Sequence, residues 1–409
     1  MEWIEVGLRE ALAKDACRII ESLLNESGLD IPGDRTLEGE HCYANRPKEV
    51  LTLFGPITLR RNYYYQSEKG RVPMDEALGL VEGYSPGTVR LMCRAGTQQG
   101  YEMASKDLKA FTGLEIEGRE IQRMVKRMGI PLQQWLDLQP GAASVPAFPV
   151  MYISADGTGV PMVREELEGR RGKQTDGSAK TREVKLGVVF TQHVVDEEGC
   201  PLRDPESSSY VGGFETAEPF GLRLRNEARR RGLGKAREIV FIGDGAKWVW
   251  EVRRQNFSGA VEILDFYHAT EHLGLLSQAI FGTGTEKAKR FQKKWGDALL
   301  GNRVEKVLQE SQAMLPRNGP RRQAAMKQLE YFRNNKNRMK YQTYRQKGYF
   351  IGSGVVEAGC KTVIGKRLKQ SGMFWSEPGA QSVINMRCAL LSSRFDDFWN
   401  QRSQAALAA

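Results

Sequence analysis

The sequence has few cysteines and no long apolar run. Its six cysteines are scattered over 409 residues, and no Cys-x-x-Cys pair occurs. In a chain of this length, such spacing argues against a disulfide framework and a structural zinc ribbon, and it favours reduced, buried thiols. No apolar stretch reaches the roughly 18 residues that a membrane-spanning helix requires, so we expect no membrane partner.

The first residues also lack the features of a targeting peptide. The chain begins Met1-Glu2-Trp3-Ile4-Glu5 and carries acids through its first turns, unlike a signal or transit peptide. With 40% hydrophobic and 27% charged residues, the composition is that of a folded protein rather than a disordered one. We therefore expect a soluble, cytoplasmic protein of two or three domains.

The basic charge is concentrated in one segment. The chain contains 60 Lys and Arg and 50 Asp and Glu, a formal net charge of +10. Residues 286–347 contain 17 basic and 5 acidic residues, a net of +12, so the rest of the chain sums to −2. Apolar residues of helical spacing occur on both sides of residues 316–320. The segment is either a solvated pair of surface helices or a helical insertion that neutralises phosphates, because clustered cations gain affinity by releasing counterions.

The first 140 residues predict a mostly helical module. Residues 1–28 predict an amphipathic helix with Leu8, Leu12, Ile19 and Leu23 near one face. A β-hairpin is expected next, and further helices follow it.

The hairpin is expected over residues 50–65, with its turn at Gly55 and Pro56. A helix over residues 102–112, a short connection that begins at Gly113 and a basic helix over residues 118–128 then have the form of a helix-turn-helix. An ordinary α-hairpin has the same pattern. If the second helix reads DNA, its basic side chains are the ones that bind: Arg119, Arg123, Lys126 and Arg127.

After an uncharged linker over residues 139–147, strands and helices alternate. Three consecutive strands predict an antiparallel meander, and two later strands separated by helices predict parallel additions, so the sheet is expected to be mixed. The expected strands are residues 148–154, 184–195, 208–214, 238–243 and 260–264, and the expected helices are 217–232, 246–257 and 269–280. A final helical stretch is expected to begin near Gly354 and to run to Leu368.

Two aspartates occupy matching positions in this α/β segment. Asp156 and Asp244 each end a short apolar run and are each followed by glycine. A carboxylate at the mouth of a buried strand, where glycine lets a ligand approach, is typical of functional sites in open α/β sheets. Each residue alone could be a helix cap or a turn residue. Two such aspartates in one sheet favour a site.

A third acid, Glu357, lies in the late helical stretch beside several basic residues. Three convergent carboxylates suit Mg²⁺ or Mn²⁺. Two such ions about 3.5–4 Å apart can activate a hydroxyl and stabilise the leaving oxygen in phosphodiester displacement.

The segments around these acids resemble the DDE transposases of the Kra-type bacterial insertion-sequence family. The resemblance covers roughly residues 50–400. It rests on five strings: Ser154-Ala155-Asp156-Gly157-Thr158-Gly159-Val160, Gly243-Asp244-Gly245-Ala246-Lys247-Trp248, Leu264-Asp265-Phe266-Tyr267-His268, Gly352-Ser353-Gly354-Val355-Val356-Glu357, and Arg367-Leu368-Lys369-Gln370-Ser371-Gly372-Met373-Phe374-Trp375-Ser376.

The resemblance implies an RNase H-like catalytic domain with a mixed five-stranded sheet flanked by helices. That domain would comprise residues 148–282 and 348–400, interrupted by an all-α insertion over residues 283–347 and preceded by a mostly helical DNA-binding module over residues 1–140. It implies a catalytic set of Asp156, Asp244, Glu357 and His268, in which the three acids hold two Mg²⁺ or Mn²⁺ ions. His268 would belong, with Asp265, to an Asp-x-x-His element.

Further basic residues are expected to bind phosphates. They lie in the insertion and in the late helical stretch: Lys293, Lys294, Arg321, Arg322, Lys361, Lys366, Arg367 and Lys369. As solvated helix charges they would need no such role.

Residues 268–272 also match His-x-x-Glu-His, the arrangement of certain zinc proteases. We do not favour that interpretation, because it explains neither Asp156, Asp244 nor the basic insertion. For His272, a place on the helix surface is expected instead.

We therefore expect a transposase that binds the terminal inverted repeats of its element and target DNA, cleaves a strand and transfers it. It would act as a homodimer or larger assembly on DNA, in the cytoplasm and associated with the nucleoid when bound. Two alternatives remain: a transposon-derived DNA-binding protein that no longer cuts, and a structure-specific RNase H-like nuclease.

Overall fold

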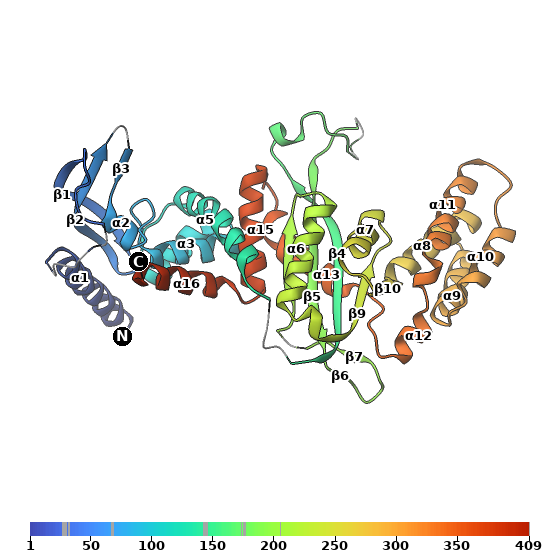
Figure 1. Cartoon of the computed structure of the whole chain (residues 1–409). Helices are drawn as coiled ribbons and strands as arrows, with labels where there is room; N and C mark the ends of the chain where they lie inside the picture. Colours follow the sequence, from blue (N-terminus) through green and yellow to red (C-terminus); the bar gives the residue numbers. More distant parts are fainter. Residues whose placement is uncertain are drawn as a thin grey trace. The chain divides into compact units, whose positions relative to one another are not determined.

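The computed structural model describes residues 1–26, 31, 33–66, 69–141, 146–172, 174, 177–204 and 206–408, with side chains up to residue 402 (Figure 1). The chain divides into two compact units, one formed by Met1–Trp135 with Asn385–Ala409 and the other by Leu136–Ile384. We call them the terminal unit and the central unit. The residues from Asn385 onward thus group with the start of the chain, whereas the sequence had placed residues up to 400 in the catalytic domain. Residues 142–145 of the expected linker lie outside the described part.

The terminal unit combines a three-stranded antiparallel sheet with helices. The sheet has the order β1-β2-β3. The elements of the terminal unit are α1 (Glu2–Glu26), β1 (His41–Thr52), β2 (Gly55–Gln66), β3 (Lys69–Arg71), α2 (Pro73–Ala77), α3 (Pro86–Gln98), α4 (Tyr101–Thr112), α5 (Gly118–Leu138) and α16 (Phe395–Ala408). Of the expected helix over residues 1–28, the last two positions are not described.

The hairpin is longer than the sequence predicted, and its turn lies at Leu53 and Phe54 rather than at Gly55 and Pro56. Thr52 pairs with Gly55 across the turn, and the pairing extends, with a register shift between Tyr43 and Arg46, to His41 opposite Tyr65. The Thr52 hydroxyl donates to the Gly55 carbonyl over 2.7 Å, and the Phe54 amide donates to the same hydroxyl. Thr52 therefore closes the turn with its side chain, a contact that alternation of apolar residues does not reveal.

The expected helix–turn–helix is present as a pair of helices. α4 ends at Gly113, which adopts the left-handed conformation with φ of 79° and terminates the helix. The second helix, α5, continues to Leu138, ten residues beyond the expected end at residue 128. Its apolar side includes Ile121 and Val125, which lie against Gly96 of α3.

The central unit contains a mixed five-stranded sheet of order β10-β9-β4-β5-β8, and its middle part is visible in Figure 1. The β4–β5 and β5–β8 pairs are antiparallel, and the β4–β9 and β9–β10 pairs are parallel. The sequence prediction of a meander followed by parallel additions is confirmed. The strands are β4 (Phe148–Pro161), β5 (Thr181–Gln192), β8 (Ser209–Gly213), β9 (Ala236–Gly243) and β10 (Val261–Leu264). A small hairpin of β6 (Val194–Val195) and β7 (Pro201–Leu202) follows β5.

Helices cover both faces of this sheet. Phe220 and Leu224 of α6 (Ala217–Arg230) lie against Gly187 on one face, and Gly359 of α13 (Gly354–Gly359) lies against Leu186 on the other. Leu186 and Gly187 are consecutive strand residues, so the Leu186 side chain and a Cβ at Gly187 point to opposite faces. α7 (Lys247–Asn256) follows β9, and α8 (Phe266–Phe281) follows β10.

The basic segment forms four helices instead of two. They are α9 (Glu286–Leu300), α10 (Val304–Ala313), α11 (Gly319–Asn335) and α12 (Tyr341–Gln346). Their buried side chains, among them Trp295, Leu329 and Phe332, belong to the same hydrophobic core as the sheet. The insertion is therefore helical, as expected, but it shares the core of the central unit.

The chain then returns to the sheet through a broken helix. α13 passes directly into a π-helical turn, Cys360–Gly365, and then into the short α14 (Lys366–Leu368). π-Helical turns inside helices occur frequently at functional sites. The next helix along the chain is α15 (Glu377–Leu391). In the described part of the chain, no helix combines the length and the apolar character that crossing a bilayer requires.

Candidate functional site

Asp156 on β4 and Asp244 just after β9 follow matching positions of two neighbouring parallel strands. The last residue pair between β4 and β9 is Ser154 with Ile242, so two residues further along each strand lead to the two aspartates. The Ser154 hydroxyl donates to the Ile242 carbonyl over 2.8 Å and holds the strands together at this point. The two predicted aspartates therefore come to the same edge of the sheet.

Asp156 lies within its strand, whereas the sequence predicted that the strand ends before it. β4 continues to Pro161 because it still pairs with β5, with Gly157 opposite Lys185 and Gly159 opposite Glu183. A Cβ at Gly157 would lie 2.6 Å from the Glu183 carboxylate, so side chains from β5 occupy the space above this glycine. The glycines therefore allow the side chains of β5 to pack against this part of β4.

The Asp156 carboxylate is partly buried and held by two contacts. Its Oδ1 accepts a hydrogen bond from the Gly157 amide over 2.6 Å, and the Cys360 thiol donates to Oδ2 over 3.5 Å. Burial, with a smaller contribution from the negative charge of Asp244, raises the pKa of Asp156. A bound cation would relieve both effects, since it favours the ionised carboxylate.

Asp244 occupies the loop that joins β9 to α7. Its Oδ1 accepts from the Ala246 amide over 2.9 Å, and its backbone carbonyl accepts from the Tyr331 hydroxyl of α11 over 2.8 Å. Gly245 has φ of 104°, and a Cβ there would lie 2.6 Å from the Tyr331 ring. Only glycine fits between this aspartate and the insertion, so Tyr331 fixes the position of the loop.

Asp265 joins β10, α8 and the segment before α13. It is the N-cap of α8: Oδ1 accepts from the His268 amide over 2.8 Å, and Oδ2 accepts from the Ser353 amide. The residue is fully buried. Burial tends to raise the pKa of Asp265, but the hydrogen bonds from His268 and Ser353 outweigh it and lower the pKa. Asp265 thus ties the start of α13 to the sheet as a buried anion.

Glu357 reaches the site from α13. Its Oε1 accepts from the Ser353 hydroxyl over 3.3 Å and lies 4.0 Å from Nδ1 of His268. The same Nδ1 lies 3.7 Å from Oδ1 of Asp265, which is longer than a hydrogen bond. Nδ1 of His268 is buried and has no hydrogen-bond partner among the residues described.

Carboxylates around His268 favour its protonated form. The Asp265 carboxylate, helped by the negative charge of Asp244, raises the pKa of His268 to about 9 against the effect of partial burial. One cationic side chain therefore stands among several carboxylates.

The metal-ligand geometry differs from the predicted set. Within the described residues, Asp265, His268 and Glu357 form a set of three whose ligand atoms all lie within 4.8 Å of one another, and Asp156 and Asp244 do not join it. Asp156 and Asp244 each accept a bond from a nearby backbone amide. The three predicted acids thus share one region but do not form a closed ligand shell.

Sequence reasoning did not single out Cys360, Ser353 and Tyr331. Asp265 was visible only through the Asp-x-x-His string. Cys360 lies one turn after Glu357, which was the available signal, but a cysteine at that spacing has no distinctive pattern. Tyr331 lies 87 residues from Asp244, so nothing local marks it.

Of the four basic residues predicted in the late helical stretch, three are exposed and one is not. Lys361, Lys366 and Lys369 are exposed, and the Lys369 ammonium donates to the Thr158 hydroxyl beside Asp156. Arg367 is wrong as a DNA-binding residue, because it is fully buried with its guanidinium 5.0 Å from the Trp375 ring centroid. Its position in the helical repeat places its side chain on the buried face of α14.

The four residues predicted to bind DNA in the insertion also fall into two groups, exposed lysines and arginines that bind backbone carbonyls. Lys293 and Lys294 are exposed on α9. The Arg321 guanidinium donates to the carbonyls of Ala279 and Ile280 at the end of α8, over 3.0 and 2.6 Å, and Arg322 donates to the Pro316 carbonyl. Arg321 therefore has a capping role instead of an open phosphate-binding geometry.

The predicted DNA-reading helix α5 is partly neutralised within the terminal unit. Arg123 pairs with both Glu82 and Glu120, and Arg127 pairs with Glu82 over 2.7 Å. Arg119 and Lys126 are exposed. The helix–turn–helix interpretation and the plain α-hairpin both remain open, but these arginines are less available than the sequence indicated.

The zinc-protease interpretation is wrong. His272 is part-buried, its ring is stacked on Tyr331 at 3.6 Å between centroids, and its Nδ1 lies 2.6 Å from the Gln328 amide oxygen. It faces α11, while His268 faces Asp265 and Glu357. The two histidines therefore do not form a common metal site, and the expected surface position of His272 is wrong as well.

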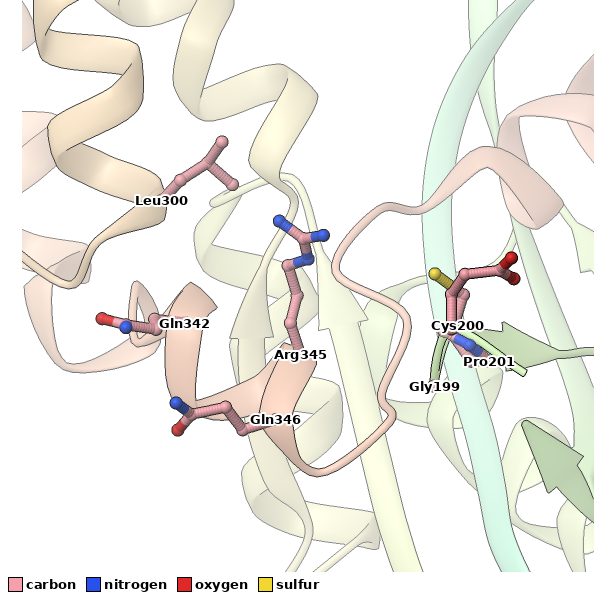
Figure 2. Close-up of a pocket in the computed structure, with 8 residues that line it drawn as sticks. Gly199, Cys200, Pro201, Leu300, Gln342, Arg345 and Gln346 are labelled. Carbon is pink, nitrogen blue, oxygen red and sulfur yellow. The ribbon is translucent and has the colours of Figure 1, made fainter. Parts of the chain in front are cut away.

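Elsewhere in the central unit, a hollow of about 290 Å³ lies beside the β6–β7 hairpin. Figure 2 shows Arg345 extending from α12 into it, between Leu300 and Cys200. None of the predicted catalytic residues lines it. This hollow is separate from the carboxylate site.

Three comparisons relate the chain to known proteins. The profile of the uncharacterised protein family UPF0236 matches residues 1–184. The "UPF0236 protein in vanSb 3'region" from Streptococcus gallolyticus is 23% identical over 385 residues, which are 90% of this chain and 78% of that protein. Among solved structures, the Drosophila P element transposase strand transfer complex aligns at 10% identity with a TM-score of 0.25, over 79% of this chain and 81% of that chain. So low a TM-score does not indicate a common fold.

Proposed function

We propose that the protein is a DNA transposase of the DDE type with an RNase H-like catalytic domain. The observation that carries the proposal is the meeting of Asp156, Asp244, Glu357 and the Asp265–His268 element at one edge of the mixed sheet. Asp156 lies on β4, Asp244 follows β9, and Asp265 caps α8. Glu357 reaches this edge from α13, more than 200 residues after Asp156. Four of the five sequence strings that resemble Kra-type transposases contain these residues.

The order of the strands supports the proposed catalytic fold. Three antiparallel strands, β4, β5 and β8, are followed by two parallel strands beside β4. Asp156 lies on the first strand of this sheet, Asp244 directly after the fourth, and Glu357 on a late helix. This is the arrangement that the resemblance implies.

The donor set fits hard divalent cations. Asp156, Asp244 and Glu357 offer carboxylate oxygens, the ligands that Mg²⁺ and Mn²⁺ prefer, and they would hold two such ions. Two bound ions would supply an activated attacking oxygen and stabilisation of the leaving oxygen. Asp265 has a different task in this proposal, because both of its oxygens already accept backbone amides.

The chain's own cations would position the DNA. The imidazolium of His268, close to Glu357, is placed to hold a non-bridging oxygen of the scissile phosphate. Lys369 next to Thr158, and Lys361 and Lys366 on the preceding turns, would bind flanking phosphates. The exposed lysines of α9 add sequence-independent affinity, so binding should weaken as salt is raised.

The test is strand cleavage and joining. The DNA beside the gene is first searched for short inverted repeats bounded by a target duplication, and labelled copies of these ends are incubated with the protein and Mg²⁺ or Mn²⁺. We expect Asp156→Asn, Asp244→Asn and Glu357→Gln each to reduce cleavage at least ~100-fold, as loss of a group that stabilises the transition state does, while Glu286→Gln on the exposed start of α9 leaves it unchanged.

The outcomes separate the alternatives. Cleavage of branched DNA without end specificity or joining would identify a structure-specific nuclease. End binding without cleavage in either metal would identify a transposon-derived DNA-binding protein. Normal cleavage by the three acid variants would contradict the catalytic assignment itself.

A further inference from the structure

The helix α1 meets the hairpin of the terminal unit along one side. Cys17, Ile20 and Leu24 pack against the small core of the hairpin. Glu21 accepts from the Thr58 amide over 2.8 Å, and Asn25 bonds the backbone of Thr58 and Arg60. These contacts cover β2 where β3 does not pair with it, and they use a face centred on residues 17, 20, 21 and 24.

A second apolar stripe on α1 is uncovered. Leu8, Leu12, Ile19 and Leu23 are 57–60% exposed. The sequence had predicted these four residues as one face of the helix, and they do share a face, but it is not the face that meets the hairpin. Large apolar side chains exposed along one face of a helix are a surface on which a partner can pack.

The spacing of the stripe is regular. Leu8 and Ile19 are eleven residues apart, and so are Leu12 and Leu23. An eleven-residue repeat corresponds to about 3.67 residues per turn, close to the α-helix itself, so the stripe runs nearly straight along α1. At about 1.5 Å per residue it is about 22 Å long.

The stripe is also symmetric about its own centre. Leu8 and Leu23 are equally far from the midpoint between residues 15 and 16, and so are Leu12 and Ile19. A second copy of the helix, turned antiparallel, places Leu8 opposite Leu23 and Leu12 opposite Ile19 at both ends. Such self-complementarity is the requirement of a two-fold symmetric interface, in which the same patch serves both partners.

We propose that α1 is a dimerisation helix that packs antiparallel against α1 of a second copy of this chain through Leu8, Leu12, Ile19 and Leu23. The inference is independent of the proposed catalytic function, because the stripe lies on the terminal unit.

Charge selects the antiparallel arrangement. Asp15 lies in the middle of the stripe and pairs with Arg18 of the same helix over 3.1 Å. A parallel pair would set Asp15 against Asp15, a repulsive contact in an apolar surrounding. In the antiparallel pair Asp15 meets Ala16, and Arg18 of the second copy comes within reach of its carboxylate. Glu5 and Glu26 lie at the outer ends, where solvent and salt screen them.

The experiment measures the mass of the full chain by light scattering during size-exclusion chromatography. The monomer mass is 46.0 kDa, so the wild type should elute as a species of about twice that mass at high protein concentration. Leu12→Lys alone and Ile19→Glu alone should each elute as monomers. Ile130→Lys, which places a lysine at a side chain 57% exposed on α5 of the same unit, should remain dimeric.

Mixing the two monomeric variants tests the geometry. In the antiparallel dimer, Lys at position 12 of one chain faces Glu at position 19 of the other, so an equimolar mixture should regain the dimer mass. If the helices packed in parallel, the lysine at position 12 and the glutamate at position 19 would not face each other, and the mixture should stay monomeric. Circular dichroism spectra that match the wild type would show that both variants are folded.

Three results would overturn the proposal. They are a monomeric wild type at the highest concentration, dimers that persist in both single variants, and a mixture of folded variants that remains monomeric.

Discussion

Arg367 illustrates how a residue can be assigned to the wrong partner from its sequence neighbours. It follows Lys366 in a basic string, but its side chain is buried against Trp375, and its guanidinium lies 3.5 Å from the Met373 sulfur. A buried guanidinium loses its solvation and depends on the contacts around it. Its role is therefore to hold the chain after α14 in place, close to Lys369 and Thr158.

We expect Arg367→Ala to lower the stability of the central unit by about 1–3 kcal/mol, because it removes a buried aromatic contact and leaves former partners unsatisfied. Thermal unfolding followed by fluorescence measures the change. Lys366→Ala, one residue earlier and exposed, is the matched control and should leave the melting temperature unchanged while weakening DNA binding. A variant of Arg367 with wild-type stability and weaker DNA binding would restore the original assignment.

Among single residues, the sequence identified Asp156, Asp244, Glu357 and His268, and the structure brings all four to one region. The sequence could predict them because a carboxylate after an apolar strand, and a short motif, are local signals. Cys360 contacts Asp156, and Tyr331 contacts Asp244, only through the fold. No spacing in the sequence announces a contact between α11 and the loop after β9.

At the scale of elements, α5 shows how a helix with four basic residues can present less charge than it carries. Glu82 lies in the segment before α3 and binds two arginines of α5. The pairs are half-exposed, so each is weak in energy, but each keeps a guanidinium away from a phosphate.

We expect Glu82→Gln to increase affinity for duplex DNA severalfold and to steepen its salt dependence, because up to two arginines become available for phosphates. Fluorescence anisotropy over a range of salt concentrations measures both quantities. Glu2→Gln makes the same change in net charge on α1 without releasing an arginine. If both variants bind alike, α5 does not contact DNA through Arg123 and Arg127.

The short strand β3 holds a loop through one arginine. Arg71 donates to both carboxylate oxygens of Glu40 over 2.7 Å and to the carbonyls of Gly33 and Arg35, and its guanidinium lies 4.4 Å from the Tyr64 ring centroid. The hydrogen bond from Arg71 lowers the pKa of Glu40 from 4.5 to about 2. The pair therefore connects the loop before β1 to the hairpin in a pH-dependent way.

A carboxyl group whose pKa is lowered in the folded state stabilises the fold above its ordinary value, and that contribution disappears as the pH falls through the folded-state value. We expect Glu40→Gln to melt below the wild type at neutral pH, with a difference that shrinks below pH 4.5 as the pH approaches 2. Calorimetry at several pH values measures this. Glu38→Gln, an exposed neighbour, serves as control; a constant difference across this range would contradict the assignment.

At the scale of the whole molecule, the end of the described chain contributes to the core of its beginning. Phe398 makes an edge-to-face contact with Trp135 at 5.7 Å between ring centroids, and the Trp399 ring lies 5.2 Å from Phe398. Arg90 and Arg94 of α3 pair with Asp396. The terminal unit is thus closed by residues from opposite ends of the chain, while the central unit is built from the continuous segment between them.

We expect Trp399→Ala to destabilise the terminal unit by about 3–5 kcal/mol, since it removes a large buried side chain. Hydrogen exchange measured by mass spectrometry should then show reduced protection in α3 and α5 and unchanged protection in β4, β9 and β10. Trp295→Ala in the insertion, equally buried, should do the reverse. Loss of protection in both units with either variant would show that they unfold as one.

Local properties of the sequence were enough to predict which residue types could do chemistry and where strands and helices alternate. Hydrophobic periodicity, glycine positions and clustered charge predicted the mixed sheet, the helical basic segment and the acids at the strand ends. The face that each helix uses was known only once the chain had folded. Folding turned Arg367 inward, paired Arg123 with glutamates, and left one of two apolar stripes on α1 uncovered. Period and composition can be read from a single chain, whereas burial depends on which distant segment packs against a face.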